Sequence, residues 1–286
     1  MSCSMKYNCC QQPDLCPRNK VCKPFHSSTE PWKRFTCECR DGYHGKNCDQ
    51  PIRSCAGYFN VRHKSGEYIV VDSQNAKYKV YCHFDSDSAW TLVQSYSYEN
   101  VRHDGNLDSR QLQKPLWEDK PVIENNLELS AYRLGKSRME CIKNNSTFLL
   151  FTCNYEKHRD IKNSDYVQIY LQNTTKSSGD ENVDVIQLDT GHTYTEQSRA
   201  TVGKVRGKIG DCDLSRCQIQ LAQNKERSLH VHFSDSNSPP CEFNTGSNEL
   251  RHCAFFGSYH HHTVEGHSCI EYQHSTTQLW FGARNP

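Results

Sequence analysis

The sequence lacks a surplus of charge of either sign and any long apolar run, and each absence excludes a class of protein. Lysine and arginine number 34 and aspartate and glutamate 33, so the formal net charge is +1 in 286 residues. Such a balance offers no basic field for a phosphate backbone, and we expect no nucleic-acid partner. The longest aliphatic or aromatic runs, 68–71 and 148–151, have four residues each. Because a membrane-spanning helix needs about 20 apolar residues, we expect no membrane insertion by this chain.

Catalytic and phosphate-binding motifs are also missing. The sequence has no H-E-x-x-H, no G-x-S-x-G and no glycine-rich loop that ends in G-K-[ST]. These patterns supply a metal-binding histidine pair, a nucleophilic serine and a phosphate cradle. Residues 203–210 (GKVRGKIG) are basic and rich in glycine, and we interpret them as a solvated loop or a weak patch for sulphated glycans or acidic matrix. We expect neither enzymatic activity nor a cofactor.

Cysteine is abundant, with 17 residues, but no two form a C-x-x-C pair. The pattern therefore favours disulfides, which persist in oxidising compartments, over zinc knuckles. Three N-x-S/T sequons, at Asn144, Asn145 and Asn173, predict glycosylation of a secreted protein. The first residues (MSCSMKYNCC) do not resemble a secretory leader, so we expect the signal peptide to lie outside this chain.

The cysteines are unevenly distributed, which predicts two domains. Nine of the 17 lie within the first 55 residues. Short segments need disulfides because they bury little apolar surface, whereas larger domains need fewer. We place the boundary near residues 50–53, which gives a module over 1–50 and a larger domain over 51–286.

The first module ends in C-x-C-x-x-G-Y-x-G-x-x-C over residues 37–48. This ending, with the cysteines before it, resembles an epidermal-growth-factor-like (EGF-like) module whose core covers residues 9–49. The resemblance implies three disulfides and leaves Cys3–Cys9 as an extra clip, although Cys9 and Cys10 could exchange roles. Calcium-binding members of that family carry an acidic cluster before the first cysteine, which this chain lacks, so we expect no metal there. The implied pairs are Cys10–Cys22, Cys16–Cys37 and Cys39–Cys48.

The second domain begins with SGEYIVV at 65–71, KVYCHF at 79–84 and AWTLVQ at 89–94. These segments resemble the start of a fibrinogen-related domain, over about residues 54–95, and the resemblance implies a Cys55–Cys82 disulfide. The later landmarks of that family are not recognisable beyond residue 100, so lectin activity is not implied. Asp85 and Asp87 fall where the family has a turn between two strands, and we interpret them as part of a surface turn.

The rest of the chain is expected to be rich in β-strands. Alternating apolar residues predict strands at 148–153, 166–171, 218–221, 229–233 and 278–282. A helix is predicted between Ser130, as its cap, and Lys143, with Leu134, Cys141 and Ile142 as its apolar contacts. The expected fold is thus a small disulfide-rich EGF-like β module plus a β-rich α+β fibrinogen-like domain.

Seven cysteines of the second domain have no pairing implied by the resemblance. Sterics allow the local pairs Cys141–Cys153 and Cys212–Cys217 without requiring them. Because 17 is odd, at least one cysteine is left over after pairing within the chain, and it could pair with a second chain, pair with a cysteine outside this sequence, or stay free. The seven are Cys141, Cys153, Cys212, Cys217, Cys241, Cys253 and Cys269.

Histidines are concentrated between residues 252 and 274, where six occur, including His260, His261 and His262. Neutral imidazole binds Zn²⁺ and Cu²⁺. Consecutive side chains point in different directions on a strand or helix, however, so a triplet does not preset one coordination sphere. We interpret this segment as an exposed polar loop and predict no metal site.

An EGF-like module, a fibrinogen-like start and a terminal QLWFG at 278–282 are together similar to a group of cnidarian secreted proteins. Some of these occur in the organic matrix of coral skeletons. The resemblance implies a secreted matrix or adhesion glycoprotein, whose partners are matrix proteins or glycans, in the organic matrix of a calcified skeleton. Two alternatives stay open: a carbohydrate-binding recognition protein, and the ectodomain of a membrane-tethered receptor. A net charge of +1 excludes a carboxylate field over the whole surface, so scaffolding or adhesion is expected.

Overall fold

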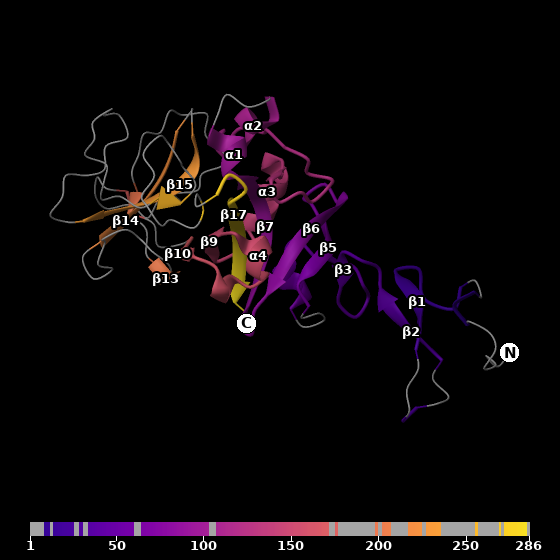
Figure 1. Ribbon diagram of the computed structural model, residues 1–286. Coiled ribbons are helices and arrows are strands. Elements are labelled where there is room, and N and C mark those ends of the chain that lie inside the picture. The colour runs from indigo at the N-terminus through magenta and orange to yellow at the C-terminus, as the bar shows by residue number, and fades with distance from the viewer. Residues whose placement is uncertain are drawn as a thin grey trace.

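The protein consists mostly of antiparallel β-sheet with few helices (Figure 1). The computed structural model describes residues 9–11, 14–25, 29–30, 34–59, 64–102, 107–171, 175–176, 198–199, 202–206, 217–224, 227–235, 255–256, 269 and 272–284. The early strands are β1 (Lys20–Pro24), β2 (Phe35–Cys39), β3 (Tyr43–His44), β4 (Gln50–Pro51), β5 (Gly66–Val71), β6 (Lys77–Phe84), β7 (Ser88–Ser97) and β8 (Ala131–Arg133). The later strands are β9 (Phe148–Cys153), β10 (Tyr166–Tyr170), β11 (Thr175–Lys176), β12 (Ser198–Arg199), β13 (Val202–Arg206), β14 (Cys217–Asn224), β15 (Arg227–Asp235), β16 (Phe255–Phe256) and β17 (Thr276–Arg284).

Short helices connect the strands. The α-helices are α1 (Tyr98–Arg102), α2 (Leu107–Leu112), α3 (Lys136–Lys143) and α4 (Tyr155–His158), and the 3-10 turns are η1 (Cys9–Gln11), η2 (Cys55–Tyr58) and η3 (Ile161–Asn163). No helix in the described part of the chain has the length and apolar character needed to cross a bilayer.

An eight-stranded sheet forms the centre of the molecule. Its order is β13-β10-β9-β17-β7-β6-β5, with β8 paired beside β7. The strand β17, from the end of the chain, lies between β7 and β9 and pairs antiparallel with both. A five-stranded sheet has the order β11-β12-β14-β15-β16, and β1 pairs with β2 in a separate hairpin. Figure 1 places that hairpin and the β14–β15 pair at opposite ends of the molecule.

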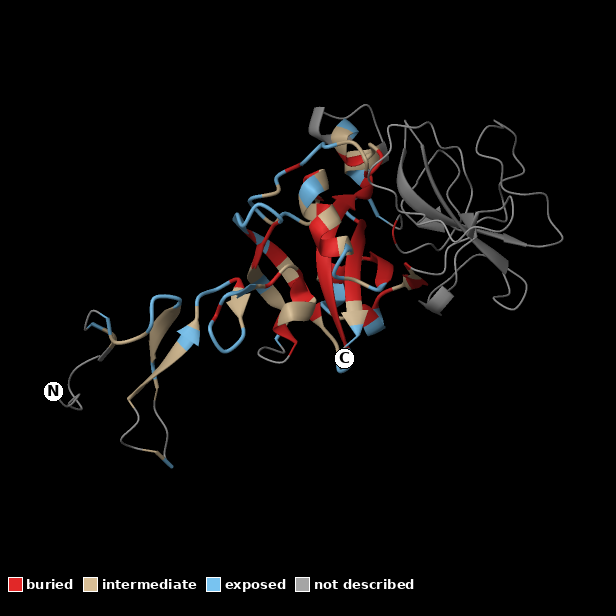
Figure 2. Ribbon diagram, turned by 180° about the vertical axis from the view of Figure 1, so that it is seen from behind, coloured by how far each residue is buried: buried red, intermediate tan, exposed pale blue. Residues whose placement is uncertain are grey.

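The core lies on the central strands of the large sheet. Every residue of β7 and β9 is buried, as are the first seven of β17, so both faces of these strands are covered (Figure 2). Their apolar side chains supply most of the driving force for folding, about 25 cal/mol per Å² of apolar surface buried. The largest fully buried side chain of this core is that of Trp280. The strands predicted at 148–153, 166–171 and 278–282 are thereby confirmed.

Polar side chains on these strands pair with one another inside the core. The Thr152 hydroxyl donates to Gln278 Oε1 at 2.9 Å and accepts from Trp280 Nε1 at 2.9 Å. Because a buried polar group without a partner costs about 1–3 kcal/mol, these bonds are what allow Thr152 and Gln278 to lie in the interior.

A buried arginine organises the loop that follows α2. Arg133 has no exposed surface. Its Nη1 donates to the carbonyl oxygen of Gln111 at 3.0 Å, and its Nη2 donates to those of Pro115 and Glu118 at 2.8 and 2.9 Å. Burial lowers the pKa of Arg133 to about 10, against the opposing effect of the Glu118 and Asp119 carboxylates. The guanidinium therefore stays charged at neutral pH and holds the loop through its carbonyl oxygens.

The helix predicted between Ser130 and Lys143 begins later than expected. Residues 131–133 pair with β7 as the strand β8, and α3 begins only at Lys136, after Gly135 in extended conformation. Ser130 is therefore not the helix cap. The backbone N–H and C=O groups of residues 131–133 form hydrogen bonds with β7 and are therefore not available to a longer helix. Met139, Cys141 and Ile142 are the buried apolar face of α3.

A close approach between β7 and β17 requires glycine at position 282. Gly282 lies opposite Trp90 in the strand pair, and a Cβ at Gly282 would lie 2.2 Å from Cε3 of the indole ring. No contact that short is tolerated, so the absent side chain of Gly282 provides the space in which the Trp90 ring lies across the sheet.

The turn between Cys39 and Cys48 packs against the large sheet. The Gly42 amide donates to the hydroxyl of Tyr58 at 3.0 Å and its carbonyl accepts from the Ile52 amide at 2.8 Å. The Gly42 Cα also faces Val71, because a Cβ there would meet Val71 Cγ2 at 2.9 Å. These contacts connect the N-terminal disulfide-bonded segment to η2 and Ile52 by hydrogen bonds and to β5 by packing against Val71.

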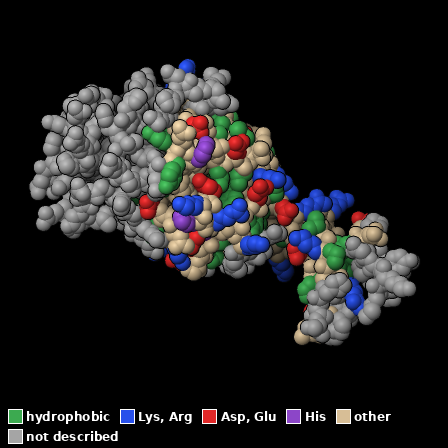
Figure 3. All heavy atoms as spheres, in the orientation of Figure 1, with side chains coloured by type: hydrophobic (Ala, Val, Ile, Leu, Met, Phe, Trp, Pro, Cys, Tyr) green, Lys and Arg blue, Asp and Glu red, His purple; other side chains and the backbone are tan. Residues whose placement is uncertain are grey.

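Charged side chains are interspersed on the described surface. On the face seen in Figure 3, Lys and Arg alternate with Asp and Glu and with apolar and other polar side chains. This mixture agrees with the near-zero net charge of the sequence.

Candidate functional site

Five disulfides connect described parts of the chain. Three lie in the N-terminal segment, and Cys55–Cys82 joins η2 to β6. The fifth, Cys153–Cys269, spans 116 positions and ties the end of β9 to the segment before β17. The first four are the pairs expected from the sequence. The N-terminal bonds are Cys10–Cys22, Cys16–Cys37 and Cys39–Cys48.

The local pairing of Cys141 with Cys153 is wrong. Cys153 lies at the end of a central strand, where Cys269 reaches it, and Cys141 is buried on α3 as a free thiol. Burial raises the pKa of the Cys141 thiol despite the nearby charge of Arg53, so the thiolate is disfavoured. The side chains of Cys3, Cys9, Cys212, Cys217, Cys241 and Cys253 lie outside the described residues.

Two of the three predicted glycosylation sites lie in the described part of the chain. Asn144 and Asn145 are both exposed directly after α3. The Asn145 side-chain amide donates to the carbonyl oxygen of Cys141 at 2.8 Å, which engages the nitrogen that a glycan would occupy. Asn173 lies outside the described residues, as do His260, His261 and His262.

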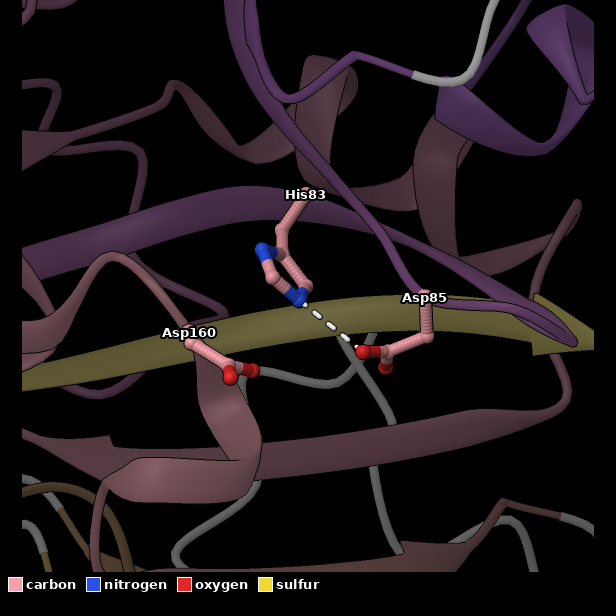
Figure 4. A group of neighbouring side chains, drawn as sticks. All are labelled: His83, Asp85 and Asp160. Carbon is pink, nitrogen blue, oxygen red and sulfur yellow. Dashed lines mark hydrogen bonds and ion pairs between the residues drawn. The ribbon is translucent and has the colours of Figure 1, made fainter.

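A cluster of three metal-ligating side chains, one histidine and two aspartates, lies where β6, the β6–β7 turn and η3 meet. The ligand atoms of His83, Asp85 and Asp160 all lie within 4.8 Å of one another. Figure 4 shows His83 and Asp85 on one continuous segment and Asp160 on another, with the polar ends of the three side chains directed toward one another. His83 is the last residue but one of β6, Asp85 begins the turn, and Asp160 caps η3.

The imidazole of His83 is held at both ring nitrogens. Nε2 lies 3.2 Å from Asp85 Oδ1. Nδ1 lies 2.8 Å from the hydroxyl of Tyr155 and 3.3 Å from that of Ser65. Burial raises the pKa of Tyr155, as does its hydrogen bond with Tyr81, so this hydroxyl is protonated and can donate or accept.

Hydrogen bonds to one carboxylate oxygen of Asp85 hold the side chain so that its other oxygen faces His83. Its Oδ2 accepts from Trp90 Nε1 at 3.1 Å and from the Ser88 hydroxyl at 3.3 Å. Burial alone would raise the pKa of Asp85, but the hydrogen bonds from His83 and Trp90 and the charges of His83 and Lys162 lower it below its ordinary value. The carboxylate is therefore ionised at neutral pH. Its side chain keeps 11% of its accessible surface, and that of His83 keeps 5%.

Asp160 reaches the cluster from the other side. Its Oδ1 accepts from the Lys162 amide at 2.9 Å, as an N-cap residue does, and its Oδ2 accepts from Asn163 Nδ2 at 3.0 Å. These bonds orient the carboxylate. Each oxygen has two lone pairs, so the bonds leave capacity for a further contact.

Sequence reasoning overlooked this cluster. Asp85 and Asp87 were expected in a surface turn, and both lie in the turn between β6 and β7. Asp87 is exposed, but Asp85 is half-buried. One signal was present: His83 and Asp85 are two positions apart at a strand end, a spacing that puts side chains on one face. Asp160 lies 75 positions after Asp85 in the sequence, and only the tertiary structure brings it near.

Comparison with known proteins does not assign the chain to a family. The chain matches no protein-family model, and no curated protein shows significant similarity to it. Its function must therefore be inferred from the residues themselves.

Proposed function

We propose that the protein is a secreted, disulfide-stabilised component of an extracellular matrix. In this proposal an EGF-like module over residues 1–50 precedes a divergent fibrinogen-like domain over 51–286. The protein acts by adhesion or scaffolding, and its setting is the organic matrix of a calcified skeleton. It is not an enzyme, and its partners are matrix proteins or glycans.

The disulfide arrangement in the N-terminal segment carries the proposal. Counting from Cys10, the first cysteine bonds to the third, the second to the fourth and the fifth to the sixth. That crossed order is the one the EGF-like resemblance implies, and six cysteines allow 15 connectivities. Cys55–Cys82 is likewise the bond implied by the fibrinogen-like start.

An oxidising location is supported by the same bonds. Five disulfides in one chain are unusual for a reducing compartment. The sequon at Asn144 is exposed and therefore accessible to glycosylation. The findings are also consistent with an ectodomain tethered outside this chain.

A scaffold benefits from domains held at a fixed angle. The hydrogen bond that the Gly42 amide donates to Tyr58 and the one that its carbonyl accepts from Ile52 restrict motion between the proposed module and the proposed domain. A spacer of this kind transmits orientation between two binding partners, which suits adhesion.

The deciding experiment is secretion from eukaryotic cells behind an added leader, followed by disulfide mapping and binding assays. We expect the five bonds to be intact, and expect retention on isolated skeletal or extracellular matrix that the same protein loses after reduction. Calcium-dependent binding to a glycan array without matrix retention would replace the proposal with carbohydrate recognition. Alkylation of most cysteines without prior reduction would overturn the extracellular assignment.

A further inference from the structure

We propose that His83, Asp85 and Asp160 bind one divalent transition-metal ion, with Zn²⁺ as the closest match to the ligand set. One imidazole nitrogen and two carboxylate oxygens, gathered within 4.8 Å of one another, are ligand types found in zinc sites. The proposal goes beyond the matrix function and does not depend on it.

The three ligand atoms have to move only slightly closer together to bind one ion. Ligand atoms bound to one Zn²⁺ at about 2.0–2.2 Å are about 3–3.5 Å apart. His83 Nε2 and Asp85 Oδ1 are already separated by 3.2 Å. Because no two ligand atoms are more than 4.8 Å apart, Asp160 has to move inward by at most about 1–2 Å, which a rotation of its half-buried side chain provides.

Each ligand is oriented by a partner outside the cluster, as the ligands of metal sites are. Trp90 and Ser88 hold Asp85 Oδ2. The amide of Lys162 holds Asp160. Tyr155 and Ser65 face His83 Nδ1, which leaves Nε2 as the ligand atom.

The contact between His83 and Asp85 shows what the ion replaces. In the neutral imidazole that carries its proton on Nε2, Nε2 donates to Asp85 and Nδ1 accepts from a hydroxyl. With metal on Nε2, the proton resides on Nδ1 and is donated to Tyr155 or Ser65. A hydroxyl both donates and accepts, so the same neighbours satisfy the imidazole in either state.

Charge and surroundings favour a dication over other ligands. Two carboxylates lie beside a largely buried ring, and the positive charge of Lys162, which is exposed, lies near Asp85. Tyr155 and Trp280 pack against the imidazole with ring centroids 5.4 and 6.5 Å away, which limits access of water on that side. Ca²⁺ is a poor match because it takes six to eight oxygen ligands.

The bound ion would act as a crosslink. His83 and Asp85 belong to the hairpin of β6 and β7, whereas Asp160 precedes β10 on the other side of β17 in the sheet order. Three protein ligands also leave a coordination position for water or for a donor from a partner.

The test is Zn²⁺ titration of the full chain, freed of metal by a chelator and dialysis, with the disulfides intact. His260, His261 and His262 are replaced by alanine in every sample, because they are a second source of imidazole. We expect one tight Zn²⁺ per chain by calorimetry, visible absorption of Co²⁺ bound at the same stoichiometry, and a higher unfolding temperature with Zn²⁺.

The deciding variant is Asp160→Asn, and Asp87→Asn is its matched control. Asparagine preserves the cap on η3 but loses the charged ligand, so we expect Zn²⁺ affinity to fall by more than about a hundredfold, beyond the loss typical of outer partners. Asp87 is exposed in the same turn as Asp85, and its variant should bind Zn²⁺ like the parent. His83→Gln should abolish the Co²⁺ absorption.

Two results would overturn the proposal. One is a parent protein that binds no Zn²⁺ at micromolar concentration. The other is unchanged affinity in Asp160→Asn, which would place the ion elsewhere in the chain. If His83→Gln is too unstable to titrate, Asp160→Asn decides alone, because Asp160 is not part of the core.

Discussion

Cys153 and Cys269 form a disulfide across 116 sequence positions, at the point where β9 and β17 pair. The bond closes a loop that contains β10, α4 and the whole five-stranded sheet. It thereby ties the last strand of the chain to a strand from its middle.

Replacing both cysteines by alanine should destabilise the protein by about 3–5 kcal/mol, because the unfolded chain regains the entropy of a long loop. Urea unfolding under non-oxidising, non-reducing conditions measures the change. Cys141→Ala is the control, since it removes a buried sulfur without breaking a bond. A double variant as stable as Cys141→Ala would contradict the importance of this bond.

Gly282→Ala should cost about 1–3 kcal/mol through overpacking, because the new methyl group overlaps the Trp90 ring. The same change in a Trp90→Leu background should cost much less, since the clashing atoms are gone. Thermal unfolding of the parent, the two single variants and the double variant gives the coupling free energy between Gly282 and Trp90. Additive effects would show that Gly282 and Trp90 do not meet in this way.

Alkaline pH should destabilise the protein through two buried tyrosines. Burial raises the pKa values of Tyr78 and Tyr132 far above their ordinary value. The folded state then keeps protons that the unfolded chain releases above about pH 10, so the stabilisation is complete below that pH and is lost above it, by about 1.4 kcal/mol per tyrosine per pH unit. Tyrosinate absorbance together with urea unfolding between neutral pH and pH 11 measures this loss.

Phenylalanine variants isolate the effect. Neither hydroxyl has a hydrogen-bond partner among the described residues, so Tyr78→Phe should leave stability at pH 7 unchanged or higher and reduce the alkaline loss. Cys141, Arg138 and Asp72 also lie near Tyr78. The lowered pKa of Arg133 makes stability rise with pH, opposite to the effect of the tyrosines. All four groups are present in both the parent protein and the Tyr78→Phe variant, so they do not affect the comparison. An unaltered alkaline slope in the variant would refute the assignment.

Asn144 rather than Asn145 should carry the glycan, because the amide nitrogen of Asn145 is bonded to the Cys141 carbonyl. Ser146→Ala removes only the sequon of Asn144, and Thr147→Ala removes only that of Asn145. After expression in eukaryotic cells, mass analysis with and without glycosidase should show the glycan lost in the first variant and kept in the second. The reverse pattern would show that the Asn145 contact does not protect it.

Local patterns in the sequence predicted most of the strands but not the contacts between distant segments. Residues 148–153 are a strand because their apolar side chains suit a buried sheet, and neighbours in sequence suffice to see this. Ser130 failed as a helix cap because pairing with β7, more than 30 positions earlier, decides the conformation of 131–133. The closeness of Asp160 to His83 could not be predicted either, because it also depends on contacts between segments that are distant in the sequence.

The position of β17 has a consequence for synthesis. The strand that completes the large sheet is made last, so β7 and β9 wait for it with unpaired edges while the intervening residues are translated. At about 5–20 residues per second, the wait after β7 lasts roughly ten to forty seconds. During that interval the exposed edges of β7 and β9 are available for pairing with other chains, until residues 276–284 have been made.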